Sequence, residues 1–408
     1  MMKIAVFASK FPLISETFVI NQIVGLLEEG VDVDIITNES PDYTVMHSAV
    51  EDYSLHEKLT VIGLDTRKNK TSRIKDTLYN CIKVVVKGEL SSLTKIVFDK
   101  HLKMSQKMNL ISAITTINSS ERKYDNIICH FGVNGYYVCK LRELGLISGP
   151  VSTVFHGYEV SHHNVTRDFK GQYFELFKVG DMMLPISDLW ASKLESWGCN
   201  RNKIKVHRMG IDVDDFELRD VSKSLASPLR VLQVGRLTEK KAILNSIKAV
   251  ALASQSSKID FTVIGDGELY HQAKQLVRSL DAESFIHLIG QQSQSQVKKY
   301  LEESDVFLLP SVRAESGDME GIPVSLMEAM AKGLIAVSTV HSGIPELIEN
   351  EVSGFLVPEH DIEALAHTLA AIPSLSEGEI ESIRRSARMT CEQKFNNCQL
   401  NSDLRYII

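Results

Sequence analysis

The 408-residue chain lacks a disulfide pattern, a long hydrophobic run and an excess of basic residues, and each absence excludes a class of protein. Its six cysteines are scattered without a C-x-x-C pair, which indicates reduced thiols rather than a disulfide framework or a zinc site. No apolar run approaches the ~20 residues that a membrane-spanning helix needs. The net charge of −7 argues against a nucleic-acid-binding protein. We therefore expect a cytoplasmic protein.

What is present is typical of a globular protein, because 44% of the residues are hydrophobic and 24% are charged. The length suffices for two domains with substantial cores. The chain starts with a short apolar stretch, residues 3–8, which lacks a small-residue cleavage pattern. We therefore expect a first strand there and not a signal sequence.

Short apolar runs alternate with helical patterns through most of the chain. In the first half, a helix capped by Ser15 is expected over 16–30, and strands are expected at 3–8, 31–37, 126–131, 151–157, 182–187 and 204–210. In the second half, strands are expected at 229–235, 260–265, 285–290, 306–311 and 334–339, with helices over 241–254, 268–280, 295–303 and 361–371. This alternation predicts parallel sheets covered on both faces.

Two such series of similar size predict two doubly wound, Rossmann-like α/β domains that face each other across an interdomain cleft. Residues 220–228 are polar and Ser-rich with a proline, so we place the linker there. The expected domains are 1–220 and 221–380. The last segment, 381–408, is expected to return to the first domain.

One segment, residues 67–107, differs from the acidic average of the chain. It holds eleven Lys and Arg against three acids, a local balance of 11 − 3 = +8, with apolar residues between the charges. Basic amphipathic helices of this kind bind anionic lipid surfaces. The same pattern also fits a pair of helices whose apolar stripe packs on the first domain, and the sequence leaves both alternatives open.

The most informative stretch is residues 318–333, where Glu320 and Glu328 lie eight positions apart around Gly321 and Pro323. Gly321 suits a turn and Pro323 suits the first turn of a helix, where its missing N–H costs nothing. The start of that helix would offer unpaired backbone N–H groups to a phosphate, from Ile322, Val324 and Ser325. The two carboxylates would accept hydrogen bonds from sugar hydroxyls. The pattern therefore predicts a nucleotide-sugar site.

Two cations are expected at the same site. Arg236 and Lys241 follow the first strand of the second series, and a guanidinium and an ammonium suit two phosphate groups. Gly265 lies in a glycine turn after the next strand, which by itself is a weak signal. Gln291 follows a third strand and fits either a loop against a flat base or a plain helix cap.

In this order and spacing, VGRLTEKKA (234–242), IGDGE (264–268), FLLPS (307–311) and EGIPVSLMEAMAKG (320–333) resemble the second domain of the retaining GT-B glycosyltransferases of family four. The segments HGYEV (156–160) and RMGIDVDDF (208–216) extend the resemblance over nearly the whole chain. The opening, residues 11–23, is similar to bacterial exopolysaccharide enzymes of the colanic-acid and amylovoran type. Two positions depart from the family pattern, since Ala242 replaces a glycine and SETF (15–18) replaces a Gly–Gly pair.

The resemblance implies a role for each matching residue. Arg236 and Lys241 hold the donor pyrophosphate, Glu328 binds the ribose, Glu320 binds the donor sugar, and His156 faces that sugar. The donor is also held by Gly321, Ile322, Val324, Ser325 and Leu326. Ser15 and Glu16 are candidates for the acceptor side. The implied reaction is transfer of a hexose, with retention, from a nucleotide-diphosphate sugar with UDP as the expected nucleotide.

The implied acceptor is a lipid-linked oligosaccharide of exopolysaccharide or O-antigen biosynthesis, at the inner face of the cytoplasmic membrane. No cofactor and no metal are expected, because Arg236 and Lys241 already supply positive charge. The two D-x-D pairs, Asp32/Asp34 and Asp212/Asp214, are explained by solvation and by a family turn.

The same residues raise two alternative functions, a glycoside hydrolase and a non-catalytic subunit. Glu320 and Glu328 are too far apart for the acid and base of a glycoside hydrolase, since eight helical positions rise ~12 Å. A catalytically silent GT-B subunit that scaffolds a membrane-associated polysaccharide assembly stays open as the alternative function.

Overall fold

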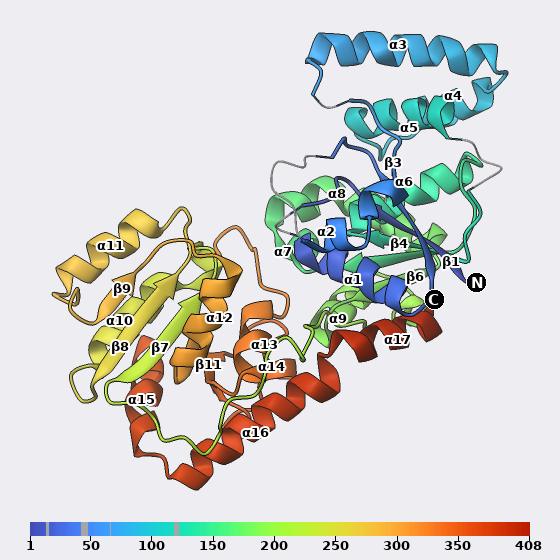
Figure 1. Cartoon of the computed structure of the whole chain (residues 1–408). Coiled ribbons are helices and arrows are strands. Elements are labelled where there is room, and N and C mark those ends of the chain that lie inside the picture. Colours follow the sequence, from blue (N-terminus) through green and yellow to red (C-terminus); the bar gives the residue numbers. More distant parts are fainter. Residues whose placement is uncertain (14–15, 42–47, 66, 118–121) are drawn as a thin grey trace. The chain divides into compact units, whose positions relative to one another are not determined.

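The computed structural model describes the chain except for residues 14–15, 42–47, 66 and 118–121 (Figure 1). The chain groups into two compact units, which we call unit 1 and unit 2. Unit 1 comprises Met1–Val160, Asn164–His207 and Asn401–Ile408, and unit 2 comprises Ser161–His163 and Arg208–Leu400. Among the described residues, no helix combines the length and the apolar character needed to cross a bilayer.

Unit 1 is built on a six-stranded parallel sheet in the order β3-β2-β1-β4-β5-β6. Its strands are β1 (Lys3–Ala8), β2 (Asp32–Thr37), β3 (Leu59–Val61), β4 (Asn126–His130), β5 (Val151–Phe155) and β6 (Met182–Pro185). Five of them are the predicted strands. The three-residue edge strand β3 was not predicted. The expected strand at 204–210 is wrong, because Ile204 makes only an isolated bridge to Met183.

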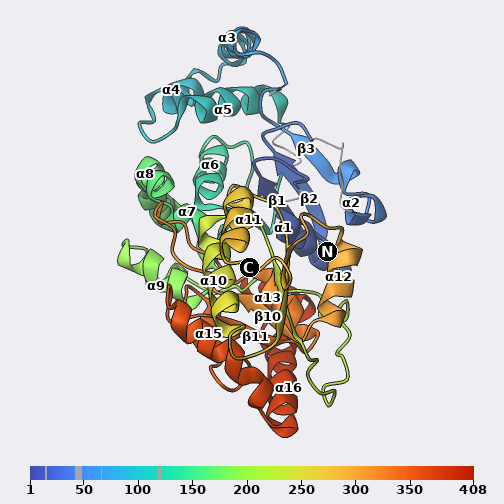
Figure 2. The same ribbon diagram turned by 90° about the vertical axis from the view of Figure 1, so that its left-hand side faces the viewer.

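The helices of unit 1 connect these strands and cover the sheet. They are α1 (Thr17–Glu28), α2 (Ser48–Asp52), α3 (Lys70–Val86), α4 (Leu90–Phe98), α5 (Met104–Thr116), α6 (Gly132–Glu143), α7 (Tyr158–Ser161), α8 (His163–Val179), α9 (Asp188–Ser196) and the end of α17 (Asn397–Ile407). Helix α1 confirms the expected helix over 16–30, whereas its expected cap, Ser15, lies outside the described residues. Helices α3 to α5 form one insertion between β3 and β4, and α3 is its outermost helix (Figures 1 and 2).

Unit 2 has a second six-stranded parallel sheet in the order β12-β11-β10-β7-β8-β9. Its strands are β7 (Leu229–Val234), β8 (Ile259–Ile264), β9 (Ile286–Leu288), β10 (Val306–Leu309), β11 (Ile335–Thr339) and β12 (Phe355–Val357). Its helices are α10 (Ile243–Ala253), α11 (Tyr270–Ser279), α12 (Gln294–Glu303), α13 (Val324–Ala331), α14 (Ile344–Leu347), α15 (Ile362–Ala371), α16 (Glu377–Lys394) and the start of α17. The predicted doubly wound α/β architecture is confirmed in both units, and the short strand β12 and the short helix α14 were not predicted here.

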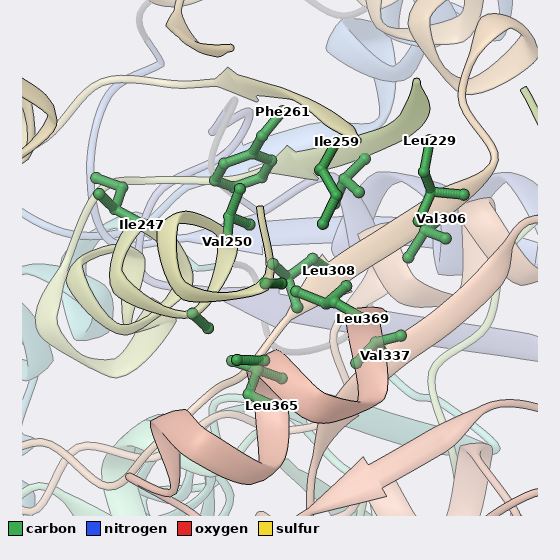
Figure 3. Close-up of a cluster of buried hydrophobic side chains, with 14 of the residues drawn as sticks. Leu229, Ile247, Val250, Ile259, Phe261, Val306, Leu308, Val337, Leu365 and Leu369 are labelled. Carbon is green, nitrogen blue, oxygen red and sulfur yellow. The ribbon is translucent and has the colours of Figure 1, made fainter. Parts of the chain in front are cut away.

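Alternate residues of the unit 2 strands enter two different cores, which is why these strands are apolar throughout. On β10, Val306 and Leu308 face the core covered by α10 and α15, whereas Phe307 and Leu309 face the core covered by α13. Figure 3 shows the first core, with Ile247 and Val250 of α10 and Leu365 and Leu369 of α15 against the sheet. Both faces of the sheet are therefore shielded from water, and the strand ends remain for ligands.

The boundaries of the units differ from the expected 1–220, 221–380 and 381–408. The change of unit falls between His207 and Arg208, and the expected linker at 220–228 lies on unit 2. The buried Arg384 of α16 donates hydrogen bonds to the carbonyls of Val221 and Lys223, which attaches that segment to the unit. Helix α16 also contributes to both cores of unit 2, so only Asn401–Ile408 belongs to unit 1.

Gly265 provides a test of the close approach between the loops after β7 and β8. Its φ is +141°, and a Cβ added there would lie 1.9 Å from the carbonyl oxygen of Gly235. We expect Gly265→Ala to lower the free energy of unfolding by about 2–3 kcal/mol, measured by urea denaturation. Gly378→Ala on α16 is the control, since nothing lies within 4 Å of its added Cβ, and it should stabilise by about 0.5–1 kcal/mol. Equal effects of the two substitutions would contradict this explanation.

Candidate functional site

Two lysines follow β7 on one turn, Glu239–Lys241, and each faces a carboxylate. Lys240 Nζ lies 3.1 Å from Asp318 Oδ2, and Lys241 Nζ lies 3.2 Å from Glu320 Oε1. Between 10% and 19% of each of these four side chains is exposed, so solvent screens the two pairs only weakly. Two of the predicted residues, Lys241 and Glu320, are therefore in contact.

Glu320 is an ionised carboxylate in a buried position. Burial by itself would raise the pKa of Glu320, but the charges of Lys241 and Lys240 outweigh it and hold that pKa below its usual value. Among the described residues, Oε1 of this carboxylate has no hydrogen-bond partner besides its ion-pair contact with Lys241. The group can therefore still accept a hydrogen bond from a hydroxyl.

The backbone of Glu320 is fixed by residues that the sequence analysis did not find. Its N–H donates to His341 Nε2 (3.1 Å), and its carbonyl accepts from Ser342 Oγ (2.6 Å). Because Nε2 accepts, the proton of the buried His341 ring lies on Nδ1, which donates to Glu359 Oε1 at 2.7 Å. His341 follows β11 and Glu359 follows β12. Their position shortly after apolar strands is the sequence feature that could have predicted them as site residues.

The start of α13 has the predicted open backbone groups. The helix begins at Val324, and Pro323 is its N-cap rather than a residue of its first turn. Val324 and Ser325 have no recorded acceptor for their N–H groups within the described residues, whereas the Leu326 N–H donates to the Pro323 carbonyl. Leu326 and Ile322 also place their side chains in the core. An anion at this helix end would therefore meet the first two N–H groups.

Glu328 lies on the second turn of α13 and is only partly exposed. Burial raises its pKa to about 7, and the charge of Lys298 opposes this shift only in part. Near neutral pH this carboxyl is therefore divided between its protonated and its ionised form. The two glutamates of the motif consequently differ, since Glu320 is ionised and Glu328 titrates.

The remaining predicted residues of unit 2 are less constrained. Arg236 and Gln291 are exposed after β7 and β9, and neither side chain has a recorded partner in the described part of the chain. Gly265 has a packing reason for being glycine, given by its approach to Gly235. Its place in a donor site stays a prediction.

In unit 1, His156 follows β5 and contacts a second histidine at the end of β4. His130 Nδ1 and His156 Nε2 are 3.0 Å apart, and the Phe18 ring centroid is 4.3 Å from that of His156. Phe131, between these elements, packs on His156 with a φ of +73°, a strained value for a bulky residue. His130 was not a predicted site residue, although its place at the end of β4, beside β5, was the available signal.

The acceptor-side candidates of unit 1 are described only in part. Ser15 lies outside the described residues. Glu16 is partly buried, and burial raises its pKa. The buried Glu159 accepts a hydrogen bond from the His156 N–H at 2.8 Å, and burial raises its pKa to about 7. Unit 1 thus brings two carboxyls of raised pKa to the same region as the histidine pair.

No group of three or more potential metal ligands occurs among the residues that the structure describes. Asp34 forms ion pairs with Lys3 and Arg122, and Asp212 accepts a hydrogen bond from the Asp214 N–H. One carboxylate of each D-x-D pair, Asp34 or Asp212, is therefore engaged in a contact within the protein.

Three histidines of unit 1, the pair and His207, predict a specific pH dependence. Burial, as the largest cause, lowers the pKa of His130 to about 3 and of His207 to about 4, and holds that of His156 well below its ordinary value. We expect the NMR ring signals of these three histidines to show no titration between pH 8 and 5. An inflection above pH 6 in any of them would contradict the burial argument, and His130→Asn and His207→Gln identify the signals.

The same shifts fix the sign of the effect on stability. The unfolded chain protonates each ring near its ordinary pKa of 6.5, but the folded chain does so only at much lower pH. Each ring should therefore cost about 1.4 kcal/mol of stability per pH unit as the pH falls below that value. The raised pKa of Glu159 works in the opposite direction between pH 7 and its ordinary value of 4.5.

Known proteins resemble this chain over most of its length. Residues 214–388 match the family model described as glycosyl transferases group 1. The whole chain is 38% identical to the putative colanic acid biosynthesis glycosyltransferase WcaL of Escherichia coli K12, of which it covers 99%. It is 41% identical to the amylovoran biosynthesis glycosyltransferase AmsK of Erwinia amylovora, over 97% of this chain and 96% of that protein.

Solved structures extend the comparison to the fold. The Anabaena protein HepE in complex with UDP has a TM-score of 0.71 at 15% identity, covering 100% of this chain and 99% of that one. The sucrose-phosphate synthase of Thermosynechococcus elongatus has a TM-score of 0.69 at 16% identity, covering 100% and 98%. The resemblance found in the sequence is confirmed: the fold is GT-B, and the chain belongs to the group 1 glycosyltransferases.

Proposed function

We propose that this glycosyltransferase moves a hexose from a UDP-sugar to a lipid-linked oligosaccharide during exopolysaccharide or O-antigen biosynthesis. The relatives named for colanic acid and amylovoran biosynthesis support the exopolysaccharide assignment. The Anabaena HepE structures in complex with UDP and with UDP-glucose support the donor class. The observation that carries the proposal is the buried Lys241–Glu320 contact, together with the open N–H groups at the start of α13.

In this proposal, each charged group acts on a different part of the donor. Lys241 and Arg236 bind the two phosphates together with the N–H groups of α13, and Lys241 exchanges part of its contact with Glu320 for a phosphate oxygen. Glu320 accepts hydrogen bonds from the sugar hydroxyls. Glu328 does so for the ribose hydroxyls.

The chemistry then requires little covalent participation by the protein. Departure of the diphosphate builds negative charge that these cations stabilise, which also makes a metal unnecessary. Retention follows if the acceptor hydroxyl attacks from the face that the diphosphate leaves, with a phosphate oxygen taking its proton. His156, with its low pKa, acts as a neutral hydrogen-bonding group. A glycosyl group found covalently attached to the protein by mass spectrometry would contradict this mechanism.

The donor class is tested by thermal shift with UDP, GDP, ADP and their sugar conjugates, with and without EDTA. We expect stabilisation by the UDP series only, unchanged by EDTA, of about 2.7 kcal/mol at 100 times the dissociation constant. Lys241→Ala should reduce that stabilisation. Lys258→Ala should not, because Lys258 is an exposed lysine that is not among the candidate site residues. No shift with any nucleotide would favour the catalytically silent scaffold subunit.

Glu328 gives the donor site a predicted pH dependence. If only its ionised form accepts the ribose hydroxyls, UDP-glucose should bind roughly tenfold more tightly at pH 8 than at pH 6, because its pKa is about 7. The diester phosphates of UDP-glucose do not titrate in this range, so the change reports the protein. Isothermal titration calorimetry of Glu328→Gln should show weaker binding without that pH dependence. A wild-type affinity that does not change with pH would contradict the assigned role.

The membrane part of the proposal concerns the outer surface of α3 and α4, which we call the outer stripe. Only Val84 of α3 is buried. Large apolar side chains of the stripe are between 46% and 81% exposed: Ile74, Leu78, Tyr79, Ile82, Val85, Val86, Leu90, Val97 and Phe98. Their spacing on α3 follows one helix face. Lys83, Lys87, Lys95 and Lys100 are exposed in the same segment of net charge +8.

An exposed apolar stripe bordered by lysines fits the surface of an anionic bilayer, because acyl chains accept the apolar side chains and phosphates attract the lysines. Packing of this stripe on unit 1, the other alternative that the sequence left open, does not account for its exposure. A protein bound there would meet a lipid-linked acceptor at the membrane face.

Vesicle flotation tests the outer stripe. We expect wild type to float with phosphatidylglycerol-containing vesicles and not with phosphatidylcholine alone, since each basic residue near the surface contributes ~1 kcal/mol. Changing Lys83, Lys87, Lys95 and Lys100 to Glu should abolish flotation. The same charge change at the exposed lysines of unit 2, Lys258, Lys274, Lys299 and Lys394, is the matched control. Equal flotation of the two variants would exclude the outer stripe.

A further inference from the structure

Unit 1 contains a polar pocket of about 220 Å³ at the carboxyl ends of β1 and β2. Ser9 follows β1, Asn38 and Glu39 follow β2, Arg73 comes from α3, and Tyr137 comes from α6. The strand order changes direction between β1 and β4, and such switch points are the usual ligand sites of open α/β sheets. The pocket exceeds what a single water needs, so it has room for a ligand group.

Three buried polar atoms of the lining residues lack partners among the residues that the structure describes. Asn38 is 8% exposed and Tyr137 is 1% exposed, and neither Asn38 Oδ1 nor the Tyr137 hydroxyl has a hydrogen-bond partner there. The same is true of Arg73 Nε. Each such atom costs roughly 1–3 kcal/mol when nothing satisfies it. Most other side chains of the lining are polar as well, so the pocket suits polar contents.

The charges of the lining favour one anionic group. The Lys103 ammonium is already paired with Asp168, at 3.0 Å, and lies over the Phe169 ring. The Arg73 guanidinium has no ion pair with any described residue, although its Nε is buried. Glu39, a carboxylate of the lining, can accept hydrogen bonds from hydroxyls. A cation without a counterion in the described part of the chain, beside hydroxyl-binding groups, suits a sugar that carries an acid.

The pocket is held rigidly, and it is connected to the histidine pair. The Ser9 carbonyl accepts from the N–H groups of Asn38 (3.2 Å) and Glu39 (3.0 Å). Ser9 Oγ donates to Asn134 Oδ1 at 2.8 Å, and Asn134 Nδ2 donates to the carbonyl of His130 at 2.8 Å. His130 contacts His156. The lining residues are therefore positioned by the same strand ends as the candidate catalytic histidine.

We propose that this pocket binds an acidic sugar of the glycan acceptor, with Arg73 on the anionic group and Asn38, Tyr137 and Glu39 on the hydroxyls. The acid is a carboxylate of the sugar or a phosphate linked to it, and both offer Arg73 the same charged oxygens. This inference rests on the proposed function, because it assigns an acceptor to the transferase. It makes Arg73 a specificity-determining residue.

Ligand-observed NMR with D-glucuronate, glucose 6-phosphate and D-glucose tests the pocket, with excess UDP present to occupy unit 2. We expect wild type to bind one of the two acidic sugars at least tenfold more tightly than glucose, and the preferred one identifies carboxylate or phosphate. Arg73→Gln should lose that preference. Lys75→Gln, an exposed position on the same helix that does not line the pocket, should keep it.

Tyr137→Phe is the second variant, because it removes only an unpartnered hydroxyl and should fold even if Arg73→Gln does not. It should weaken the acidic sugar and glucose alike by several-fold. Equal binding of acidic and neutral sugars by wild type, or a preference that survives in Arg73→Gln, would overturn the proposal. Failure of UDP-glucose to bind while the acidic sugar still binds would instead contradict the proposed donor, so the two failures are distinguishable.

Discussion

The direction of the strands is the constraint on which the rest of the structure depends. All strands of a parallel sheet end at the same edge, and helices on both faces leave that edge as the place where polar residues gather. In unit 1 this brings Ser9, Asn38, His130 and His156 to neighbouring strand ends. In unit 2 Arg236 and His341 follow β7 and β11, which lie on either side of β10. The candidate groups that follow strands are thus a consequence of sheet topology, whereas Arg73, Tyr137 and Glu328 come from helices.

Within unit 2, the lysine and the carboxylate of each ion pair hold one another in position. A buried ammonium without a partner would be costly, but Asp318 and Glu320 pair with Lys240 and Lys241 and hold them in place before any ligand arrives. The His341–Glu359 pair fixes the backbone of Glu320, which keeps the Glu320 carboxylate beside Lys241. Such preorganisation lets positive charge meet a developing anion with little rearrangement.

The fold was largely predictable from the sequence, because long apolar strands report burial on both faces. The edge strands β3 and β12, each three residues long, were not predicted, although the edge strand β9 of the same length was. Glu320, Glu328, Arg236 and Lys241 were found by spacing and resemblance. His130, His341, Glu359 and Arg73 were not, because their importance arises from contacts between strands or helices far apart in the chain. Their place after strands was visible for the first three, but their partners were not.

The insertion formed by α3 to α5 enters and leaves unit 1 between β3 and β4 without contributing a strand. Its inner side supplies Arg73 to the polar pocket, and its outer side carries the apolar stripe. Recombination or mutation confined to these helices can alter both surfaces while every strand register is preserved. Under the functions proposed for these two surfaces, acceptor preference and membrane binding would change together, and separately from donor binding by residues in the second half of the chain.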